Sequence, residues 1–322
     1  MLHFTASFAR RAAAISVLGG LIAGCSSAGV PTANPASDSS SLANGHGVRT
    51  SAPQVITHGW MSPDAKKKKS LIYWGDYNNS TITIYSAKGT NGKELGQITT
   101  GLSNPERLFV DKQGSVYATN IGTGTITAYK RGKTSPFLTI SNGVNRPTGL
   151  TVDGAGNVYC ANVGNNTITV YPKGSTSPSE TLSASTPEYL ATDAKDNLYA
   201  SVANGIEEWG PGSSNGTMLG LPAGANGIEV DKSGNFIGIY GAQIEYFPAG
   251  SNQPSMEIPV NGSPYALSLS GNEKQLYVSV ESGSPFIIQN VAYPKGTTLS
   301  TKLSNNGGQW PFAVSPDSAL GT

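Results

Sequence analysis

The chain has 322 residues and a formal net charge of +1 at pH 7, and only 13% of its residues are charged. Residues 71–322 hold 14 Lys and Arg against 18 Asp and Glu, which argues against a nucleic-acid partner because nucleic acids select basic surfaces. The histidines, His3, His46 and His58, all precede this region. Hydrolases built on a Ser/His or Cys/His pair and zinc sites built on imidazole are therefore disfavoured there.

The first 25 residues have the pattern of an export signal. Arg10 and Arg11 precede an apolar run over residues 12–24, shorter than the roughly 20 apolar residues of a membrane span. The run ends in LIAGC, which resembles the lipobox of bacterial lipoproteins. This resemblance implies that residues 1–24 are a signal peptide and that Cys25 becomes the lipidated (palmitate-bearing) N-terminus. An ordinary secretory signal with an incidental cysteine is the alternative.

The same motif predicts where the protein resides. A lipidated Cys25 places it at the bacterial cell envelope, in contact with the membrane through the lipid anchor only. Ser26 rather than Asp follows the cysteine, which favours the outer membrane over the inner one. Residues 25–70 are rich in Ser, Ala, Pro, Asn and Gly without periodicity, so we expect a flexible tether. Its lysine run, residues 66–69, is interpreted as a solvated spacer, with contact to anionic lipid as the alternative.

A unit of roughly 40 residues repeats from residue 71 to the C-terminus, and its clearest copy, VDGAGNVYCANVGNNTITVYPKG, begins at Val152. Each copy has an apolar run ending in a polar turn, an aromatic-centred strand, a hairpin strand of alternating Thr and apolar residues, and a weaker fourth segment. Four short antiparallel strands per repeat are typical of a β-propeller. Residues 71–322 therefore predict an all-β propeller of about six four-stranded blades.

The two ends of this region predict how the ring closes. Residues 71–89 match the outer strands of a blade that lacks its inner strand, and residues 310–322 supply an inner strand with nothing after it. We therefore expect one blade to be shared between the termini.

Several recurring residues have structural explanations. An aspartate ends four of the apolar runs just before a Gly or Asn turn, and we interpret it as a turn former rather than a calcium ligand. These aspartates are Asp111, Asp153, Asp193 and Asp231. One large aromatic residue per repeat is expected to pack between blades, at Tyr85, Tyr129, Tyr171, Trp209 and Tyr293. Cys160 is expected to be a small buried core residue.

The copies VDGAGNVYCANVGNNTITVY and VDKQGSVYATNIGTGTITAY resemble the NHL-repeat propellers and, more distantly, the lactonase-like propellers of the gluconolactonase and senescence-marker group. The resemblance covers residues 71–322. Lactonases of that group hold a divalent cation in the central channel through Glu, Asn and Asp side chains. The matching positions here give candidate channel ligand-binding residues at Glu106, Thr148, Glu188 and Asn226.

Two functions follow as hypotheses. The leading one is a lipid-anchored, non-enzymatic and monomeric propeller that binds an envelope protein, a glycan or a small ligand. The alternative is a metal-dependent lactonase-like hydrolase in which Glu106, Glu188 and Asn226 hold calcium or magnesium, the hard cations that oxygen ligands prefer. In this alternative, the residues that follow the lactonase pattern lack a clear equivalent of its catalytic aspartate. In the leading hypothesis, Glu106 and Glu188 are solvated or paired with Arg107 and Arg146.

Overall fold

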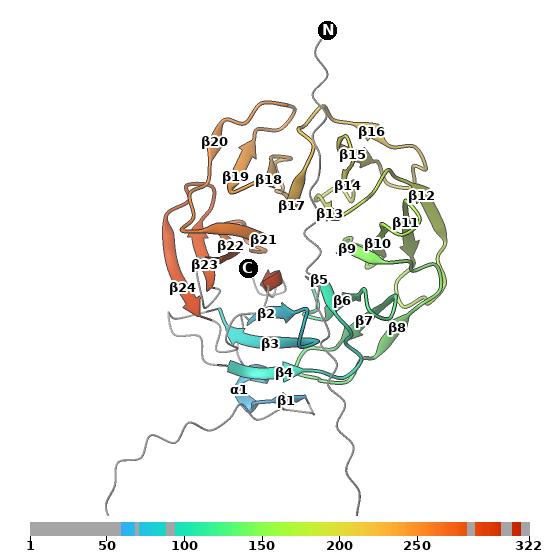
Figure 1. Cartoon of the computed structure of the whole chain (residues 1–322), viewed down its shortest axis with the longest axis vertical. Coiled ribbons are helices and arrows are strands. Elements are labelled where there is room, and N and C mark those ends of the chain that lie inside the picture. The colour runs from blue at the N-terminus through green and yellow to red at the C-terminus, as the bar shows by residue number, and fades with distance from the viewer. Residues whose placement is uncertain (1–58, 68–70, 88–93, 282–286, 304–310, 317–322) are drawn as a thin grey trace, which may run out of the picture. The chain divides into compact units, whose positions relative to one another are not determined.

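The computed structural model describes residues 59–67, 71–87, 94–281, 287–303 and 311–316. Residues 55–322 belong to one compact unit, in which the described strands form six antiparallel sheets arranged in a ring (Figure 1). The expected six-bladed β-propeller is confirmed.

Five blades have four strands each, in sequence order from the channel outward. Blade 2 contains β5 (Pro105–Val110), β6 (Val116–Asn120), β7 (Thr125–Tyr129) and β8 (Leu138–Ile140). Blade 3 contains β9 (Pro147–Val152), β10 (Val158–Asn162), β11 (Thr167–Tyr171) and β12 (Glu180–Ser183). Blade 4 contains β13 (Tyr189–Thr192), β14 (Leu198–Val202), β15 (Gly205–Trp209) and β16 (Thr217–Met218). Blade 5 contains β17 (Ala225–Val230), β18 (Phe236–Tyr240), β19 (Gln243–Phe247) and β20 (Met256–Glu257). Blade 6 contains β21 (Ser263–Leu269), β22 (Gln275–Glu281), β23 (Ile287–Ala292) and β24 (Thr298–Leu303).

Blade 1 joins the two ends of the propeller. Its strands β2 (Leu71–Asp76), β3 (Thr81–Ser86) and β4 (Glu94–Ile98) come from the N-terminal side, and its inner strand, β25 (Pro311–Pro316), comes from the C-terminal side. β25 pairs with β2 in antiparallel fashion, with Ile72 opposite Pro316 and Trp74 opposite Val314. The expected shared blade is confirmed, so backbone hydrogen bonds close the ring.

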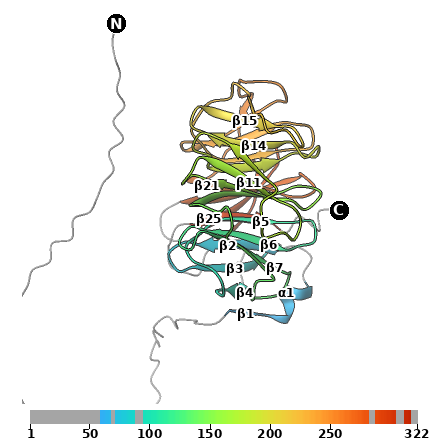
Figure 2. The same cartoon turned by 90° about the vertical axis from the view of Figure 1, so that its right-hand side faces the viewer.

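Blade 1 also has a fifth strand that the repeat pattern did not predict. β1 (Trp60–Met61) pairs with the outer edge of β4 and leads into α1 (Pro63–Lys67), where Ala65 is fully buried (Figure 2). Gly96 permits this contact, because a Cβ there would lie 2.8 Å from the Met61 sulfur. The packed region thus begins upstream of the predicted boundary at residue 71, within the predicted tether. The predicted signal peptide, Cys25 and the rest of that tether lie outside the described residues.

The hydrophobic core lies between neighbouring blades. Leu108 and Val110 of β5, for example, pack against Ile82 and Ile84 of blade 1. The expected inter-blade tyrosines fit this arrangement: Tyr129 is fully buried and its hydroxyl donates to the Thr100 carbonyl at 2.8 Å, in the loop that leaves blade 1. Tyr171 repeats the contact one blade later, to the Asn142 carbonyl at 2.7 Å. Because each blade is clamped by its neighbours, the inner strands form a rigid wall around the channel.

Cys160 and the four turn aspartates have the structural roles predicted for them. Cys160 is fully buried, and burial raises the pKa of its thiol. Asp153 accepts backbone hydrogen bonds from Gly156 and Asn157, both at 2.8 Å, and side-chain bonds from Asn157 and Tyr159. Equivalent backbone bonds hold the turns at Asp111, Asp193 and Asp231. These aspartates therefore fix the turns that end the inner strands.

Candidate functional site

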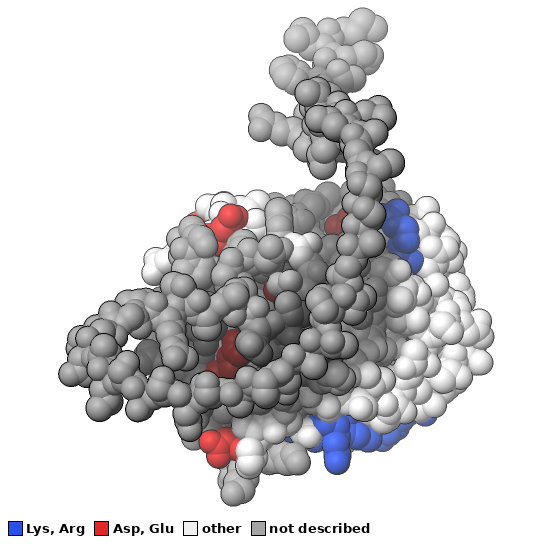
Figure 3. Space-filling model, turned by 60° about the horizontal axis from the view of Figure 1, so that its bottom comes forward, with Lys and Arg blue, Asp and Glu red and all other residues white. Residues whose placement is uncertain are grey.

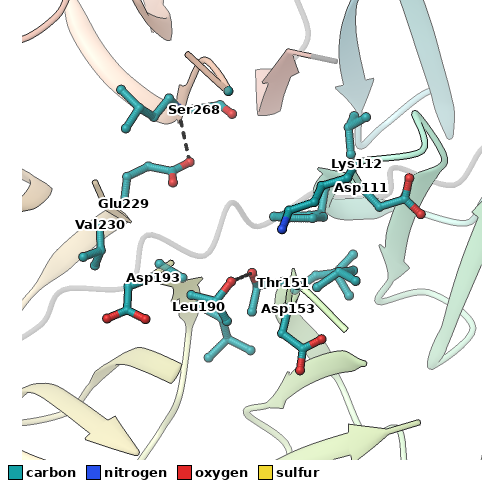
Figure 4. Close-up of a pocket in the computed structure, with 18 of the residues that line it drawn as sticks. Asp111, Lys112, Thr151, Asp153, Leu190, Asp193, Glu229, Val230 and Ser268 are labelled. Carbon is teal, nitrogen blue, oxygen red and sulfur yellow. Dashed lines mark hydrogen bonds between the residues drawn. The ribbon is translucent and has the colours of Figure 1, made fainter. Parts of the chain in front are cut away.

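The inner strands enclose a cavity of about 580 Å³ in the central channel. It is lined by the inner strands β5, β9, β13, β17 and β21 and by the turns that follow them. We call this the turn end of the channel, and the opposite end, where the inner strands begin, the start end. Figure 4 shows inner strands and turns from several blades converging on the cavity.

One position on each of these strands supplies a different side chain to the cavity. Alternate residues of each strand face the two neighbouring blades, and Leu108, Leu150, Leu190, Ile228 and Leu267 pack in inter-blade clusters while they also line the cavity. The residues that follow them face the other neighbouring blade and line the cavity as well; they are Phe109, Thr151, Ala191, Glu229 and Ser268. Glu229 is the ionisable member of this set. The cavity wall is therefore mostly neutral at this level, with one carboxyl group.

The Glu229 carboxyl group projects from β17 toward β21 of the next blade (Figure 4). One of its oxygens accepts a long hydrogen bond of 3.4 Å from the Leu269 backbone N–H. Burial raises the pKa of Glu229, the Leu269 N–H lowers it and the negative charge of Glu273 raises it, and together they bring it to about 8. At neutral pH this side chain is mostly protonated, and it can donate as well as accept a hydrogen bond.

The other polar groups of the turn end lie toward blades 2 to 4. The hydroxyl oxygens of Thr151, on blade 3, and Thr192, on the neighbouring blade 4, lie 3.3 Å apart. The Lys112 ammonium group points into the cavity (Figure 4) and lies 3.3 Å from where a Cβ on Gly154 would be. Gly154 itself donates its N–H to Asp196 at 2.7 Å. The cavity thus has a lysine on the blade 2 side and a carboxyl group on the blade 5 side.

Arg107 and Tyr189 mark the limit of the cavity toward the start end. Both line it, and the Arg107 guanidinium carbon lies 4.0 Å from the centre of the Tyr189 ring. They come from blades 2 and 4, and blade 3 has Gly149 at the same position along its strand. A Cβ on Gly149 would lie 2.6 Å from the Glu188 carbonyl oxygen, so close packing of blades 3 and 4 requires glycine there. This cation–π pair narrows the channel on that side.

The residues predicted as ligands lie at the start end, and the residues that line the cavity do not include Glu106, Thr148, Glu188 or Asn226. Glu106 and Glu188 do approach each other: burial raises the pKa of Glu106, Arg107 lowers it, and the Glu188 charge raises it. The Thr148 hydroxyl donates to the Pro187 carbonyl at 3.1 Å, next to Glu188. Asn226 is exposed, and no hydrogen bond joins it to these three residues.

The described residues contain no group of three or more His, Cys, Asp or Glu side chains that could hold a metal ion together. Glu106 and Glu188 supply two carboxylates, and Asn226 would have to supply the third ligand through its amide oxygen. Binding of calcium or magnesium by these three residues stays a prediction.

Sequence reasoning missed Glu229 because it compared only the residue that comes directly after the opening residue of each inner strand. The signal was present four residues after that strand's opening Ala225, where the other copies have Phe, Thr, Ala and Ser. When the copies of a repeat are aligned and one position is ionisable in one copy but neutral in the others, that position is a candidate for a function that the other blades do not share.

The face of the molecule that Figure 3 shows carries few charged side chains among the residues that are described. In Figure 3, the described surface is mostly neither acidic nor basic, and the charged side chains are scattered. None of the helices in the described ranges combines the length and hydrophobicity needed to span a bilayer.

Comparisons with known proteins establish the architecture. No protein-family model and no curated protein sequence matches the chain. The structure is similar to a chain from the crystal structure of a nidogen/laminin complex, with a TM-score of 0.62 and 18% identity, over 79% of this chain and 99% of that one. It is also similar to a chain of Kuenenia stuttgartiensis hydrazine synthase, with a TM-score of 0.53 and 15% identity, over 73% of this chain and 76% of that one. At such identities the likeness shows the fold alone, which is that of a six-bladed β-propeller.

Proposed function

We propose that the protein is an exported, lipid-anchored binding module whose propeller takes a small ligand, or the terminal unit of a glycan, into the turn end of its channel. The observation that carries this proposal is the cavity of about 580 Å³, which five inner strands frame. Its volume lies in the range of roughly 300–1,000 Å³ that is typical of small-molecule sites. A folded protein domain is too large for it.

The chemistry of the wall supports binding. Ligand sites combine apolar surface with a few polar groups that fix orientation, and here Phe109 and Ala191 alternate with Thr151, Ser268 and Glu229. The inner strands are edge strands, so they also present backbone N–H and C=O groups to the channel. Because adjacent blades hold these strands in place, a ligand meets a preformed site and little binding energy is lost in ordering it.

A cavity-filling substitution tests binding. The full chain in detergent micelles is incubated with a small-molecule extract of the cell envelope, and the retained compounds are identified by mass spectrometry. We expect retention by the unchanged chain and its loss in Ser268→Trp, which fills the cavity. Thr139→Trp, on the exposed outer strand β8, is the matched control and should retain the compounds. Equal retention by both folded variants, or none by the unchanged chain, would contradict a channel site. If Ser268→Trp fails to melt cooperatively, Ala191→Leu replaces it.

The lipid anchor has its own test. The sequence LIAGC supports it, and labelled palmitate should be incorporated into the chain, which should sediment with membranes. Cys25→Ser should abolish the incorporation. Cys160→Ala removes the other cysteine and should leave the incorporation intact, because Cys160 is buried in the ring. Incorporation into Cys25→Ser would show that the anchor is not at this residue.

A metal-dependent lactonase is the second candidate, and the approach of Glu106 and Glu188 favours it. An ion that binds only the folded state raises its stability by about 2.7 kcal/mol at 100 times the dissociation constant. Thermal denaturation after chelation, with calcium or magnesium then restored, should show this gain, and Glu106→Ala should remove it. No gain with either ion would exclude this candidate.

A further inference from the structure

Small residues line the cavity wall on the Glu229 side. Two positions nearer the start end, β17 has Gly227 and β21 has Ala266, whereas the corresponding residues of blades 2 and 4 are Arg107 and Tyr189. All four line the cavity. These two residues place no long side chain over the cavity here, and Ile239 packs behind Gly227, where a Cβ would lie 3.0 Å from it. We call the part of the cavity wall that Gly227, Glu229 and Ala266 line the niche between blades 5 and 6; the cation–π pair occupies the other side.

The fold makes little use of this carboxyl group. Each turn aspartate accepts several hydrogen bonds, as Asp231 does from the Ser233 and Asn235 backbone, each at 2.9 Å. In contrast, the one hydrogen bond to Glu229 in the described structure is the 3.4 Å bond from Leu269. A carboxyl group that is partly removed from water and poorly compensated gains most from a ligand that brings a positive charge or a strong donor.

The charges around Glu229 also favour a cation. Glu273, on the turn after β21, and Asp193, on the turn after β13, are acidic neighbours in the cavity wall. Lys232, on the turn after β17, reaches across to blade 6, where its ammonium donates to the Gly271 carbonyl at 3.0 Å; burial raises the pKa of Glu273 there, and the charge of Lys232 lowers it. Its backbone N–H donates to the Glu273 carboxylate at 2.9 Å. Of the other cations in the cavity wall, Lys112 (Figure 4) and Arg107 are on blade 2, opposite blade 5 in the ring, and Lys173 is on blade 3.

We propose that the niche between blades 5 and 6 binds a small organic amine, whose ammonium group pairs with the Glu229 carboxylate. This inference rests on the proposed binding function and names the class of ligand. The lysine on blade 2 repels the ammonium group, so the amine is directed toward blade 5 and the rest of the ligand extends toward blade 2.

Proton release follows from the pairing. Glu229 is mostly protonated in the free protein at pH 7, because its pKa is raised to about 8. An ammonium ion stabilises the ionised form, so binding transfers the Glu229 proton to the buffer. Below the pKa that Glu229 has in the ligand-free protein, the ionised fraction of its carboxyl group falls about tenfold per pH unit, and the affinity for the amine falls with it. Alkylamines stay protonated throughout this range, as lysine does.

Cyclohexylammonium and its neutral counterpart cyclohexanol test the proposal by calorimetry on the full chain in detergent micelles. We expect cyclohexylammonium to bind, about tenfold more weakly at pH 6 than at pH 7, and cyclohexanol not to bind detectably. Two buffers with different ionisation enthalpies should reveal release of about one proton at pH 7. Glu229→Gln should weaken binding at least tenfold and remove its pH dependence. Glu257→Gln, on the exposed strand β20 of the same blade, is the matched control and should leave both unchanged.

Three results would overturn the amine proposal. They are equal binding of the two probes, pH-independent binding of the amine, and no binding of either. None of these results contradicts the proposed binding function. The retention experiment with Ser268→Trp tests that function separately, and a ligand of another class would then be the one that this variant fails to retain. If Glu229→Gln does not fold, the proton release measured on the unchanged chain decides.

Discussion

The two ends of the channel both contain carboxyl groups, yet they differ in what surrounds those groups. At the start end, Glu106 and Glu188 lie near each other and near Arg107, outside the cavity. At the turn end, Glu229 is the one ionisable residue at its level of the wall, accepts one long hydrogen bond and lines the cavity. The comparison teaches that a count of acidic residues is a poor guide to a site. Space and unmet hydrogen-bonding capacity are better ones.

Removing β25 should disrupt the start end and the turn end of the channel together, and we expect it to have the largest effect on stability. A chain that stops after residue 310 lacks the inner strand of blade 1, so β2 keeps its pairing with β3 but loses its partner on the channel side. We expect the cooperative thermal transition to be lost or to fall by tens of degrees. A chain that stops after residue 316 keeps β25 and is the matched control. An unchanged melting temperature in the shorter chain would show that strand pairing does not close the ring.

Asp153→Ala measures how much a carboxyl group that stabilises a turn contributes to the free energy of unfolding, compared with an exposed carboxyl group. It deletes two part-buried backbone hydrogen bonds of 2.8 Å and the side-chain bonds from Asn157 and Tyr159, so we expect a loss of about 2–4 kcal/mol in urea unfolding. The exposed Glu188, changed to Ala, should cost less than about 0.5 kcal/mol. Equal losses of unfolding free energy in Asp153→Ala and Glu188→Ala would show that the turn aspartate stabilises the fold no more than an exposed carboxyl group does.

Glu229→Gln should stabilise the protein at high pH. The folded-state pKa of Glu229 is raised above its unfolded value, so the folded state holds a proton that the unfolded state releases, and stability falls as pH rises from about 4.5 to about 8. After discounting for partial solvent access, we expect the variant to gain about 1–3 kcal/mol at pH 9 and little at pH 4. Urea unfolding of this variant and of Glu257→Gln at both pH values measures the gain. A gain that is the same at both pH values would contradict the raised pKa.

Arg107→Gln should give the smallest effect and reports on the start end. It removes the cation–π contact with Tyr189, worth about 0.5–1 kcal/mol, and the charge that lowers the pKa of Glu106. The pKa of Glu106 should therefore rise, as NMR of labelled glutamate carboxyl carbons would show. Arg146→Gln, at an exposed loop position, should leave it unchanged. A fall in the Glu106 pKa would reverse the assigned sign.

The repeat made most of the architecture predictable. The shared blade, the turn aspartates and the inter-blade tyrosines depend on local patterns that recur in register, so their roles could be inferred from the residues. The pairing of Trp60 and Met61 with β4 could not, because this segment belongs to no repeat and its partner strand is about 35 residues away. The environment of Glu229 could not be predicted either. Its raised pKa depends on burial and on Glu273 of the next blade, more than 40 residues further along the chain.

A crystal structure of the protein with cyclohexylammonium bound tests the central claim most directly, because it shows which end of the channel is occupied. The account predicts the ammonium group beside the Glu229 carboxylate, between blades 5 and 6. A probe bound instead between Glu106 and Glu188 would contradict it and move the functional site to the start end.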